Sequence, residues 1–328
     1  MLAALGLALV IGEQPIARGV VLRDSIGELE GEPQAIHELV LDLDDPALVL
    51  RVVEPGPNTC ASVDEIAARA ELVDGRPPVA AINFGFFSPW APCLASSQVI
   101  SLIQQDGHTL AQNFDAGPKG ALGWTIEGEP MTTIISRAGD WPQARFALGG
   151  RGILIAEGRP LAPDRWRDDE GLAAEFAEAR HPRTAIGVDA DRGKALLITV
   201  DGRRASAAGM SLIELRERFS AAASEGLTID AALNLDGGGS TTMWIAGRGI
   251  VNQPSDPGGP RAVVGALLIY AAPLEPELAD PAPVHEPAIA EPGASGCRAT
   301  RASPSVWLAI ALGLLAIALG LRRRAQES

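Results

Sequence analysis

The feature that most constrains the fold of this chain is its series of short apolar segments. Between residues 35 and 270, runs rich in Ala, Val, Ile and Leu are separated by Gly, Pro, Asp and Asn. Runs of about four to nine residues between turn-forming residues are typical of β-strands. The predicted strands cover residues 35–43, 47–53, 79–82, 185–188, 195–200, 231–235 and 262–270.

Two segments carry signals for the start of a helix. Ser62 precedes Glu65 by three residues, and Ser211 precedes Glu214 by the same spacing. Each pair can form a capping box, which satisfies amide donors in the first helical turn. Because the strands and helices do not alternate as regular β–α–β units, we predict an α+β fold. Residues 19–270 would form a single domain around a mixed β-sheet with a few packed helices.

The charge of the chain excludes one large class of partner. Its 328 residues carry a formal net charge of −14, whereas binding to nucleic acid depends on clustered Lys and Arg. Nucleic acid is therefore not a predicted partner. The acidic residues show no ligand cluster with the spacing of a metal site, which leaves a structural Ca²⁺ open but unsupported, and no cofactor is predicted.

Both ends of the chain differ from its middle. Residues 2–11 are apolar but too short to span a bilayer, so they fit either the core of a signal peptide or an ordinary first strand or helix. We set residues 1–18 apart as a candidate truncated signal segment.

The last part of the chain has the pattern of a membrane or sorting signal. Residues 271–305 are rich in Pro, Ala and Glu, which predicts an extended tether. Residues 306–321 are apolar and uncharged, and Arg322, Arg323 and Arg324 follow at once. With Cys297, residues 306–328 resemble a MYXO-CTERM sorting tail, the alternative being a plain membrane anchor. Either interpretation places the domain outside the cytoplasm, at the cell surface, anchored in the membrane or released.

Two cysteines remain for the folded part. Cys60 and Cys93 do not lie in a C-x-x-C motif, so they show no sign of zinc or thioredoxin-like chemistry. They can form a disulfide in an oxidising compartment or remain as two buried thiols.

The segment 233–242, Leu-Asn-Leu-Asp-Gly-Gly-Gly-Ser-Thr-Thr, is the first candidate for a functional site. Side chains alternate along a strand, so Asn234 and Asp236 would share one face while the neighbouring leucines share the other. Three successive glycines are costly to order and allow a ligand to approach the backbone, whose amides can bind an anion. A hairpin turn is the alternative explanation, because Asp-Gly is a strong turn signal.

Other polar residues stand at the ends of apolar runs in the same way. Each alone fits a turn or a cap, but their repetition is typical of a site assembled at strand ends. These residues are Asn83, Asn252, Asp201, and the pair Arg183 and Thr184.

Six segments together resemble the phosphodiester glycosidase family. They cover residues 80–87, 146–160, 181–203, 206–215, 231–247 and 251–270, within a resemblance that runs from about residue 35 to 270. The resemblance implies a hydrolase that cleaves a sugar-1-phosphodiester, such as an α-N-acetylglucosamine-1-phosphodiester, into free sugar and a phosphomonoester.

The expected chemistry suggests a role for each candidate residue. A phosphomonoester, with a second pKa of about 6, leaves readily at neutral pH, so one carboxylate can suffice as nucleophile or base. Asp236 is the predicted carboxylate, with Asp201 as its possible partner. Guanidinium groups bind phosphate oxygens well, so Arg183 and Arg261 are predicted to hold the phosphate. The other predicted substrate-binding residues are Asn83, Thr184, Asn234, Gly237, Gly238, Gly239, Ser240 and Asn252.

Three other functions compete with this interpretation. A P-loop would require a Lys before Ser240, and none is present. A serine hydrolase would require a G-x-S-x-G elbow and a base; only His181 could serve as that base, and its place in His-Pro-Arg-Thr favours a turn residue. A cell-surface protein that binds phosphorylated glycans without turnover would use the same arginines and glycines.

Overall fold

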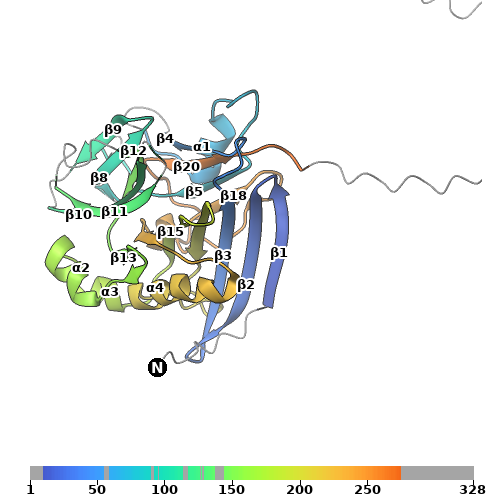
Figure 1. Ribbon diagram of the computed structural model, residues 1–328. Coiled ribbons are helices and arrows are strands. Elements are labelled where there is room, and N and C mark those ends of the chain that lie inside the picture. Colours follow the sequence, from blue (N-terminus) through green and yellow to red (C-terminus); the bar gives the residue numbers. More distant parts are fainter. Residues whose placement is uncertain are drawn as a thin grey trace, which may run out of the picture. The chain divides into compact units, whose positions relative to one another are not determined.

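The computed structural model describes residues 10–54, 59–89, 92–94, 96–113, 117–125, 127, 129–136 and 144–274 (Figure 1). Residues 1–9 lie outside this range. So do most of the predicted tether, Cys297, the apolar segment 306–321 and the arginine cluster. Within the described ranges, no helix has both the length and the apolar character needed to cross a membrane.

The largest sheet has eight strands. In spatial order they are β1 (Val10–Ala17), β2 (Val20–Leu29), β3 (Glu32–Asp42), β16 (Lys194–Val200), β15 (Arg183–Asp189), β17 (Ala231–Asn234), β13 (Ile153–Ala156) and β14 (Arg159–Pro160). β1 lies within the segment that the sequence prediction set apart from the domain, and it pairs with β2 along most of its length. The folded domain therefore starts earlier in the chain than residue 19.

Two five-stranded sheets and a two-stranded sheet complete the β-structure. The first five-stranded sheet contains β11 (Pro130–Ile135), β10 (Lys119–Thr125), β12 (Ala144–Gly149), β8 (Ser101–Gln105) and β9 (His108–Asn113). The second contains β19 (Gly249–Ile250), β18 (Met243–Ile245), β5 (Ala80–Asn83), β20 (Ala266–Tyr270) and β4 (Val49–Val53). The two-stranded sheet is formed by β6 (Phe87–Ser88) and β7 (Gln98–Val99).

The fold is predominantly β, and the prediction of a mixed sheet was wrong. Each strand pair in the described part of the chain is antiparallel, including the central pairs β15–β16 and β15–β17. Parallel pairing needs long crossover connections, whereas the turn from β15 to β16 is only four residues long. Each of the seven predicted strands overlaps an observed strand, which supports the use of short apolar runs as the signal.

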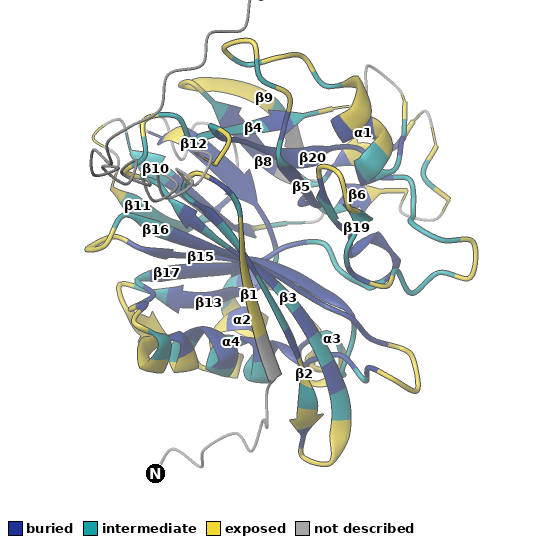
Figure 2. Ribbon diagram, turned by 90° about the vertical axis from the view of Figure 1, so that its right-hand side faces the viewer, coloured by how far each residue is buried: buried dark blue, intermediate teal, exposed yellow. Residues whose placement is uncertain are grey.

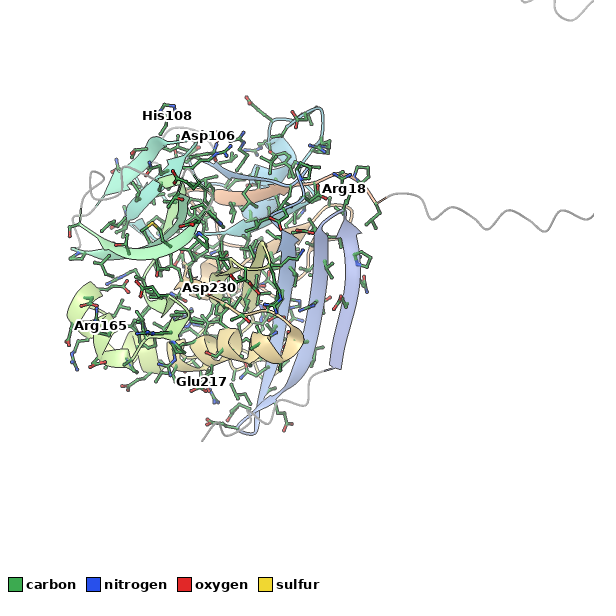
Figure 3. All side chains as sticks on the ribbon, in the orientation of Figure 1. Arg18, Asp106, His108, Arg165, Glu217 and Asp230 are labelled. Atoms are coloured by element: carbon green, nitrogen blue, oxygen red, sulfur yellow. A yellow bond between two sulfur atoms is a disulfide. The ribbon has the colours of Figure 1, made fainter. Side chains whose placement is uncertain are left out.

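Four α-helices accompany the sheets in the described residues. They are α1 (Val63–Arg69), α2 (Pro163–Glu170), α3 (Ala174–Glu178) and α4 (Leu212–Ala221). The capping box predicted for α4 is confirmed: the Glu214 amide donates to Ser211 Oγ at 3.1 Å, and the Ser211 amide donates to Glu214 Oε2 at 2.8 Å. Figure 1 shows α2, α3 and α4 along one side of the eight-stranded sheet, with the five-stranded sheets on the other side. In Figure 3, Arg165 of α2 and Glu217 of α4 extend from the outer side of this helical layer.

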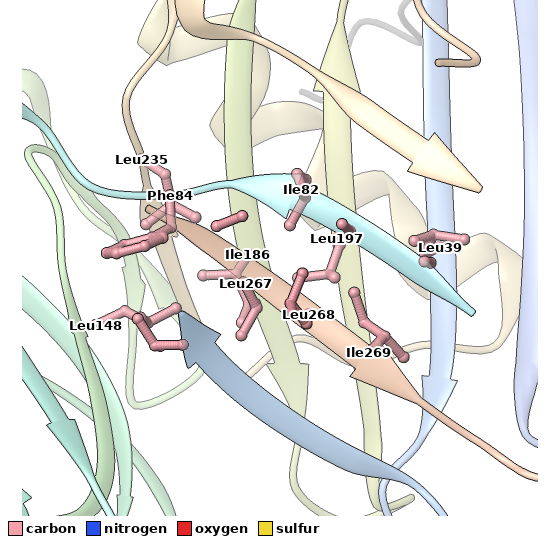
Figure 4. Packing of buried hydrophobic residues seen from close by; sticks show 14 of the residues in the cluster. Leu39, Ile82, Phe84, Leu148, Ile186, Leu197, Leu235, Leu267, Leu268 and Ile269 are labelled. Carbon is pink, nitrogen blue, oxygen red and sulfur yellow. The ribbon is translucent and has the colours of Figure 1, made fainter. Parts of the chain in front are cut away.

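The two faces of the large sheet bury two separate cores. Along β16, Leu196 and Ile198 pack with the helices, whereas Leu197 packs against the five-stranded sheets. Strand alternation produces this division. Leu197 also stands opposite Leu39 and Ile186 in the strand register, so a row of apolar side chains crosses the sheet towards β5 and β20 (Figure 4). Figure 2 shows β15 and β17 as buried strands, while the turn between β2 and β3 is exposed.

Cys60 and Cys93 form a disulfide, with their Cα atoms 6.0 Å apart. The sequence left open a disulfide or two buried thiols, and the structure contains the disulfide. The bond joins the segment before α1 to the segment between β6 and β7, which are separated by 33 residues in sequence.

Candidate active site

Asp236 lies where the chain leaves the large sheet. The Leu235 amide still donates to the Thr184 carbonyl of β15, at 2.8 Å, but the Asp236 amide donates to the Phe84 carbonyl just after β5, also at 2.8 Å. The chain therefore passes from one sheet to another between these two residues. β17 ends at Asn234, so Asp236 does not share a strand face with Asn234 as the sequence predicted.

The side chain of Asn83 fixes the backbone of Asp236. Its Nδ2 donates to the Asp236 carbonyl at 2.7 Å. Its Oδ1 accepts from Thr184 Oγ1 at 2.9 Å and from the Thr242 amide at 3.0 Å. Asn83 is almost fully buried, and both ends of its side-chain amide form hydrogen bonds within the protein. It positions the loop after β17 and is not itself exposed to a ligand.

The three glycines after Asp236 allow close packing within the protein. A Cβ on Gly237 would lie 2.6 Å from the Pro182 carbonyl oxygen, and one on Gly239 would lie 2.2 Å from Arg261 Nη2. Gly238 has φ +62°, and a Cβ there would lie 3.2 Å from Arg203 Nη2. Larger residues would displace these arginines.

Only part of the predicted amide site is open to a ligand. The Gly238 amide donates to the Pro182 carbonyl at 2.8 Å, so it is already used. The Gly237 amide interacts with the Asp236 carboxylate. The loop therefore presents its carboxylate and the arginines packed on it, rather than a row of unused amides.

Asp236 and the glycines open into a cavity of about 410 Å³, a size typical of small-molecule sites. One wall is aromatic and apolar and another is cationic. The lining residues are Phe86, Phe87, Ile100, Arg151, Phe176, His181, Arg183, Arg203, Asp236, Gly237, Gly238, Gly239 and Arg261.

The environment of Asp236 favours its protonated form. Burial raises the pKa of this carboxyl from 3.8 to about 7, although the Ser240 hydroxyl, the Arg261 guanidinium and the Gly237 amide act in the opposite direction. A carboxyl group with a pKa near neutrality can exchange a proton readily at physiological pH. Such a perturbed group in a cavity is typical of a catalytic residue.

Arg183 is held rigidly at the cavity wall. Its Nε donates to the Met210 carbonyl at 2.8 Å, and its Nη2 donates to the carbonyls of Phe176 and Ala179 at 2.8 and 3.0 Å. The guanidinium also lies 5.0 Å from the centre of the Phe176 ring. Burial, followed by the nearby charge of Arg203, lowers the pKa of Arg183 to about 10. It remains a cation at neutral pH.

Arg203 and His181 contribute to the same wall, and the sequence prediction did not include them in the site. Arg203 Nη2 lies 3.2 Å from His181 Nδ1. Since a guanidinium can only donate, Nδ1 accepts this hydrogen bond and the imidazole proton resides on Nε2. Burial and the charges of Arg183 and Arg203 lower the pKa of His181, which is therefore neutral at pH 7. Instead of serving only as a turn residue, His181 lines the cavity.

Comparison with known proteins identifies the family. A family model described as phosphodiester glycosidase matches residues 77–270, which is more than half of the chain. The chain belongs to the phosphodiester glycosidase family. It is a hydrolase of the glycosidase type. No match is found among curated protein sequences.

Two solved structures share the fold of this glycosidase. The catalytic domain of zebrafish N-acetylglucosamine-1-phosphodiester alpha-N-acetylglucosaminidase has 22% sequence identity and a TM-score of 0.54, over 80% of this chain and 82% of that one. A hypothetical protein from Synechocystis has 17% identity and a TM-score of 0.57, and the match covers 80% of this chain and 64% of that one. This glycosidase thus spans less than two thirds of the length of the Synechocystis protein.

The charge of Arg261 acts on the Asp236 carboxyl and lowers its pKa against the larger effect of burial, so the two side chains lie close together. The predicted role of Arg261 in phosphate binding stays a prediction. Arg261 donates from Nε to Asp256 Oδ2 at 2.8 Å and from Nη2 to Asp256 Oδ1 at 3.1 Å. This bidentate pair sets the orientation of the guanidinium against Gly239. Arg183 and Arg261 thus both line the cavity of the glycosidase with Asp236.

Asp201 lies outside the cavity lining, which argues against its predicted role as a catalytic partner. Its carboxylate accepts the Gln253 amide at 2.9 Å and Asn252 Nδ2 at 3.1 Å, and His37 Nε2 is 3.5 Å away. Burial acts to lower the pKa of His37, but hydrogen bonds to Asp201 and Asp24 outweigh it and raise that pKa to about 9. Asp201 is therefore a buried anchor for the segment around residue 252.

The remaining polar candidates of the glycosidase also lie behind the cavity. Asn252 Oδ1 accepts the Met243 amide at 2.7 Å, and Asn234 Nδ2 donates to the Arg151 carbonyl at 2.8 Å. Thr184 is fully buried against Asn83. Ser240 is fully buried next to the glycine loop, which consists of residues 237–239. None of these four side chains lines the cavity, so they hold its walls in place instead of binding sugar hydroxyls. Within the described residues, no group of three or more His, Cys, Asp or Glu side chains could hold a metal ion.

Proposed function

We propose that the protein hydrolyses a sugar-1-phosphodiester at the anomeric carbon and releases the free sugar and a phosphomonoester. The observation that carries this proposal is the cavity itself, in which Asp236 is the sole carboxylate among the described lining residues and four arginines line the same walls. The zebrafish enzyme of the same fold is named for N-acetylglucosamine-1-phosphodiester, which makes that compound the first model substrate.

The arrangement suits cleavage of the bond between the sugar carbon and the phosphate oxygen. The departing oxygen keeps the bonding electron pair, and a phosphomonoester holds this charge well because its second pKa is about 6. Arginines stabilise the phosphate by charge-assisted hydrogen bonds as its charge increases. A separate general acid is then not required.

Asp236 supplies the remaining chemistry. In its ionised form it either attacks the anomeric carbon directly, forming a glycosyl ester that water hydrolyses, or removes a proton from an attacking water. Asp201 has no part in this step, because its carboxylate is engaged with Gln253, Asn252 and His37.

The disulfide between Cys60 and Cys93 supports the predicted export of the domain. Disulfides form and persist in oxidising compartments and are rare in the cytosol. We accordingly propose that the glycosidase acts outside the cytoplasm.

The pH dependence of turnover tests the role of Asp236. Since the pKa of its carboxyl is about 7 and the ionised form reacts, kcat/KM should rise about tenfold per pH unit below 7 and level off above it. The measurement is the release of N-acetylglucosamine from its 1-phospho-methyl diester between pH 5 and 9. A rate that is flat across this range would exclude Asp236 as the reacting carboxylate.

A further inference from the structure

The cavity carries more positive charge than one phosphodiester can neutralise. Neither Arg183 nor Arg203 has a carboxylate partner within salt-bridge distance among the described residues. The carboxylate that most affects Arg183 is Glu214, but its two oxygens are bound by Arg180. A phosphodiester carries a single negative charge, so it leaves at least one of these two guanidiniums without a counter-charge.

The other two arginines of the cavity do not remove this excess. Arg261 is balanced by Asp256. Arg151 lies near Glu170, but Lys119 is close enough for the two cations to share that single carboxylate. Asp236 brings one negative charge when it is ionised, but Arg261 is the only arginine among the described residues whose charge acts on its carboxyl group.

The cations occupy two places around the glycine loop. Arg261 packs on Gly239 beside the Asp236 carboxylate. Arg203 packs on Gly238 and, with Arg183, forms the wall that includes His181. Arg183 is buried whereas Arg203 is exposed, so this second place extends from the interior to the mouth of the cavity.

We infer that the substrate carries a second anionic group next to the scissile phosphate, bound by Arg183 and Arg203, while Arg261 serves the phosphate at Asp236. The inference rests on the proposed function and narrows its substrate class. The second group is either the other half of a diphosphate or a phosphomonoester on the alcohol. Both present the same chemistry to the guanidiniums, namely oxygens with additional negative charge.

Three synthetic substrates distinguish these possibilities. All contain N-acetylglucosamine, joined to methanol through one phosphate, joined to methanol through a diphosphate, or joined through one phosphate to an alcohol that bears a phosphomonoester. With the full-length protein, kcat/KM for at least one doubly charged substrate should exceed that for the methyl phosphodiester by about tenfold. Whichever is preferred identifies the source of the second charge.

Arg203→Gln is the variant that localises the effect. It should lower kcat/KM for the preferred doubly charged substrate about tenfold more than kcat/KM for the methyl phosphodiester, since only the doubly charged substrate has the second anionic group that Arg203 binds. Arg248→Gln is the matched control. It removes the same charge from an exposed position in the turn between β18 and β19, away from the cavity. Equal rates for all three substrates, or an equal loss on all of them in Arg203→Gln, would overturn the inference.

A binding measurement separates this inference from the proposed function. Calorimetry on the full-length Asp236→Asn variant would compare inorganic pyrophosphate with dimethyl phosphate, without turnover. Pyrophosphate should bind at least tenfold more tightly, and Arg203→Gln in the same background should remove most of that difference. If pyrophosphate binds more tightly as expected but the wild type hydrolyses no sugar phosphodiester, the second anion site is supported and the proposed reaction is wrong. If the methyl phosphodiester is cleaved but pyrophosphate has no advantage, the reaction stands and the second anion site fails.

Discussion

Asp236→Asn should reduce turnover by about a hundredfold or more while the protein remains folded. The substitution keeps the size of the side chain and one oxygen, but it removes the charge that attacks the sugar or activates water. The measurement is kcat on the methyl phosphodiester of N-acetylglucosamine at pH 8, where the wild-type carboxyl is ionised.

Melting temperatures of the same variant provide the control. Because the pKa of Asp236 is raised from 3.8 to about 7 in the folded state, the folded protein retains this proton more strongly than the unfolded chain. The resulting stabilisation is present below pH 3.8 and is lost as the pH rises through 7. Asp236→Asn should therefore melt at the same temperature as the wild type or higher at pH 8, with a smaller advantage at pH 5. A lower melting temperature at pH 8 together with a normal rate would remove Asp236 from the mechanism.

Asn83→Ala should have the largest effect on stability. It leaves three buried groups without partners, namely the Asp236 carbonyl, the Thr242 amide and the Thr184 hydroxyl. Each unsatisfied buried polar group costs about 1–3 kcal/mol, so the free energy of unfolding should fall by about 3 kcal/mol or more. Turnover per folded molecule should fall as well, since Asn83 fixes the backbone that carries the reacting carboxylate. Denaturant unfolding and kcat on the folded fraction measure the two effects.

Asn252→Ala is the matched control for this prediction. Asn252 is also buried and also makes three hydrogen bonds, to the Met243 amide, Asp201 and the Thr241 carbonyl. It does not contact Asp236, so its loss should cost similar stability and leave the rate per folded molecule largely unchanged. Equal losses of rate in the two variants would show that Asn83 has no particular connection with Asp236.

The sequence predicted correctly which strand ends form the candidate site. It predicted less well what each residue at those strand ends does. Asp236, Arg183 and Arg261 do meet in one cavity. Asn83 and Asn252 were expected to bind sugar hydroxyls, but both are used to join strands of different segments. An amide side chain that follows an apolar run has the same sequence signature in either role. Only the contacts of Asn83 with Thr184 and Thr242, distant in sequence, distinguish them.

The glycine run shows why part of the site could not be predicted. Gly238 and Gly239 indicated that something approaches the backbone closely, which is correct, but the approaching groups include Arg203 and Arg261 of the protein itself. Arg203 lies in a polar loop, where no strand alternation predicts the direction of its side chain, and its backbone φ is +59°. The antiparallel pairing could not be predicted either, because an apolar run indicates that a strand is present but not which strand it pairs with.

The central claim is that the bond broken is the one between the sugar carbon and oxygen, and hydrolysis in water labelled with heavy oxygen tests it most directly. The methyl phosphodiester of N-acetylglucosamine would be hydrolysed to completion and both products analysed by mass spectrometry. If Asp236 acts at the anomeric carbon, directly or through water, the label enters the sugar and methyl phosphate remains unlabelled. Label in the phosphate product would mean attack at phosphorus, and would contradict the assignment of this cavity to glycosidic cleavage.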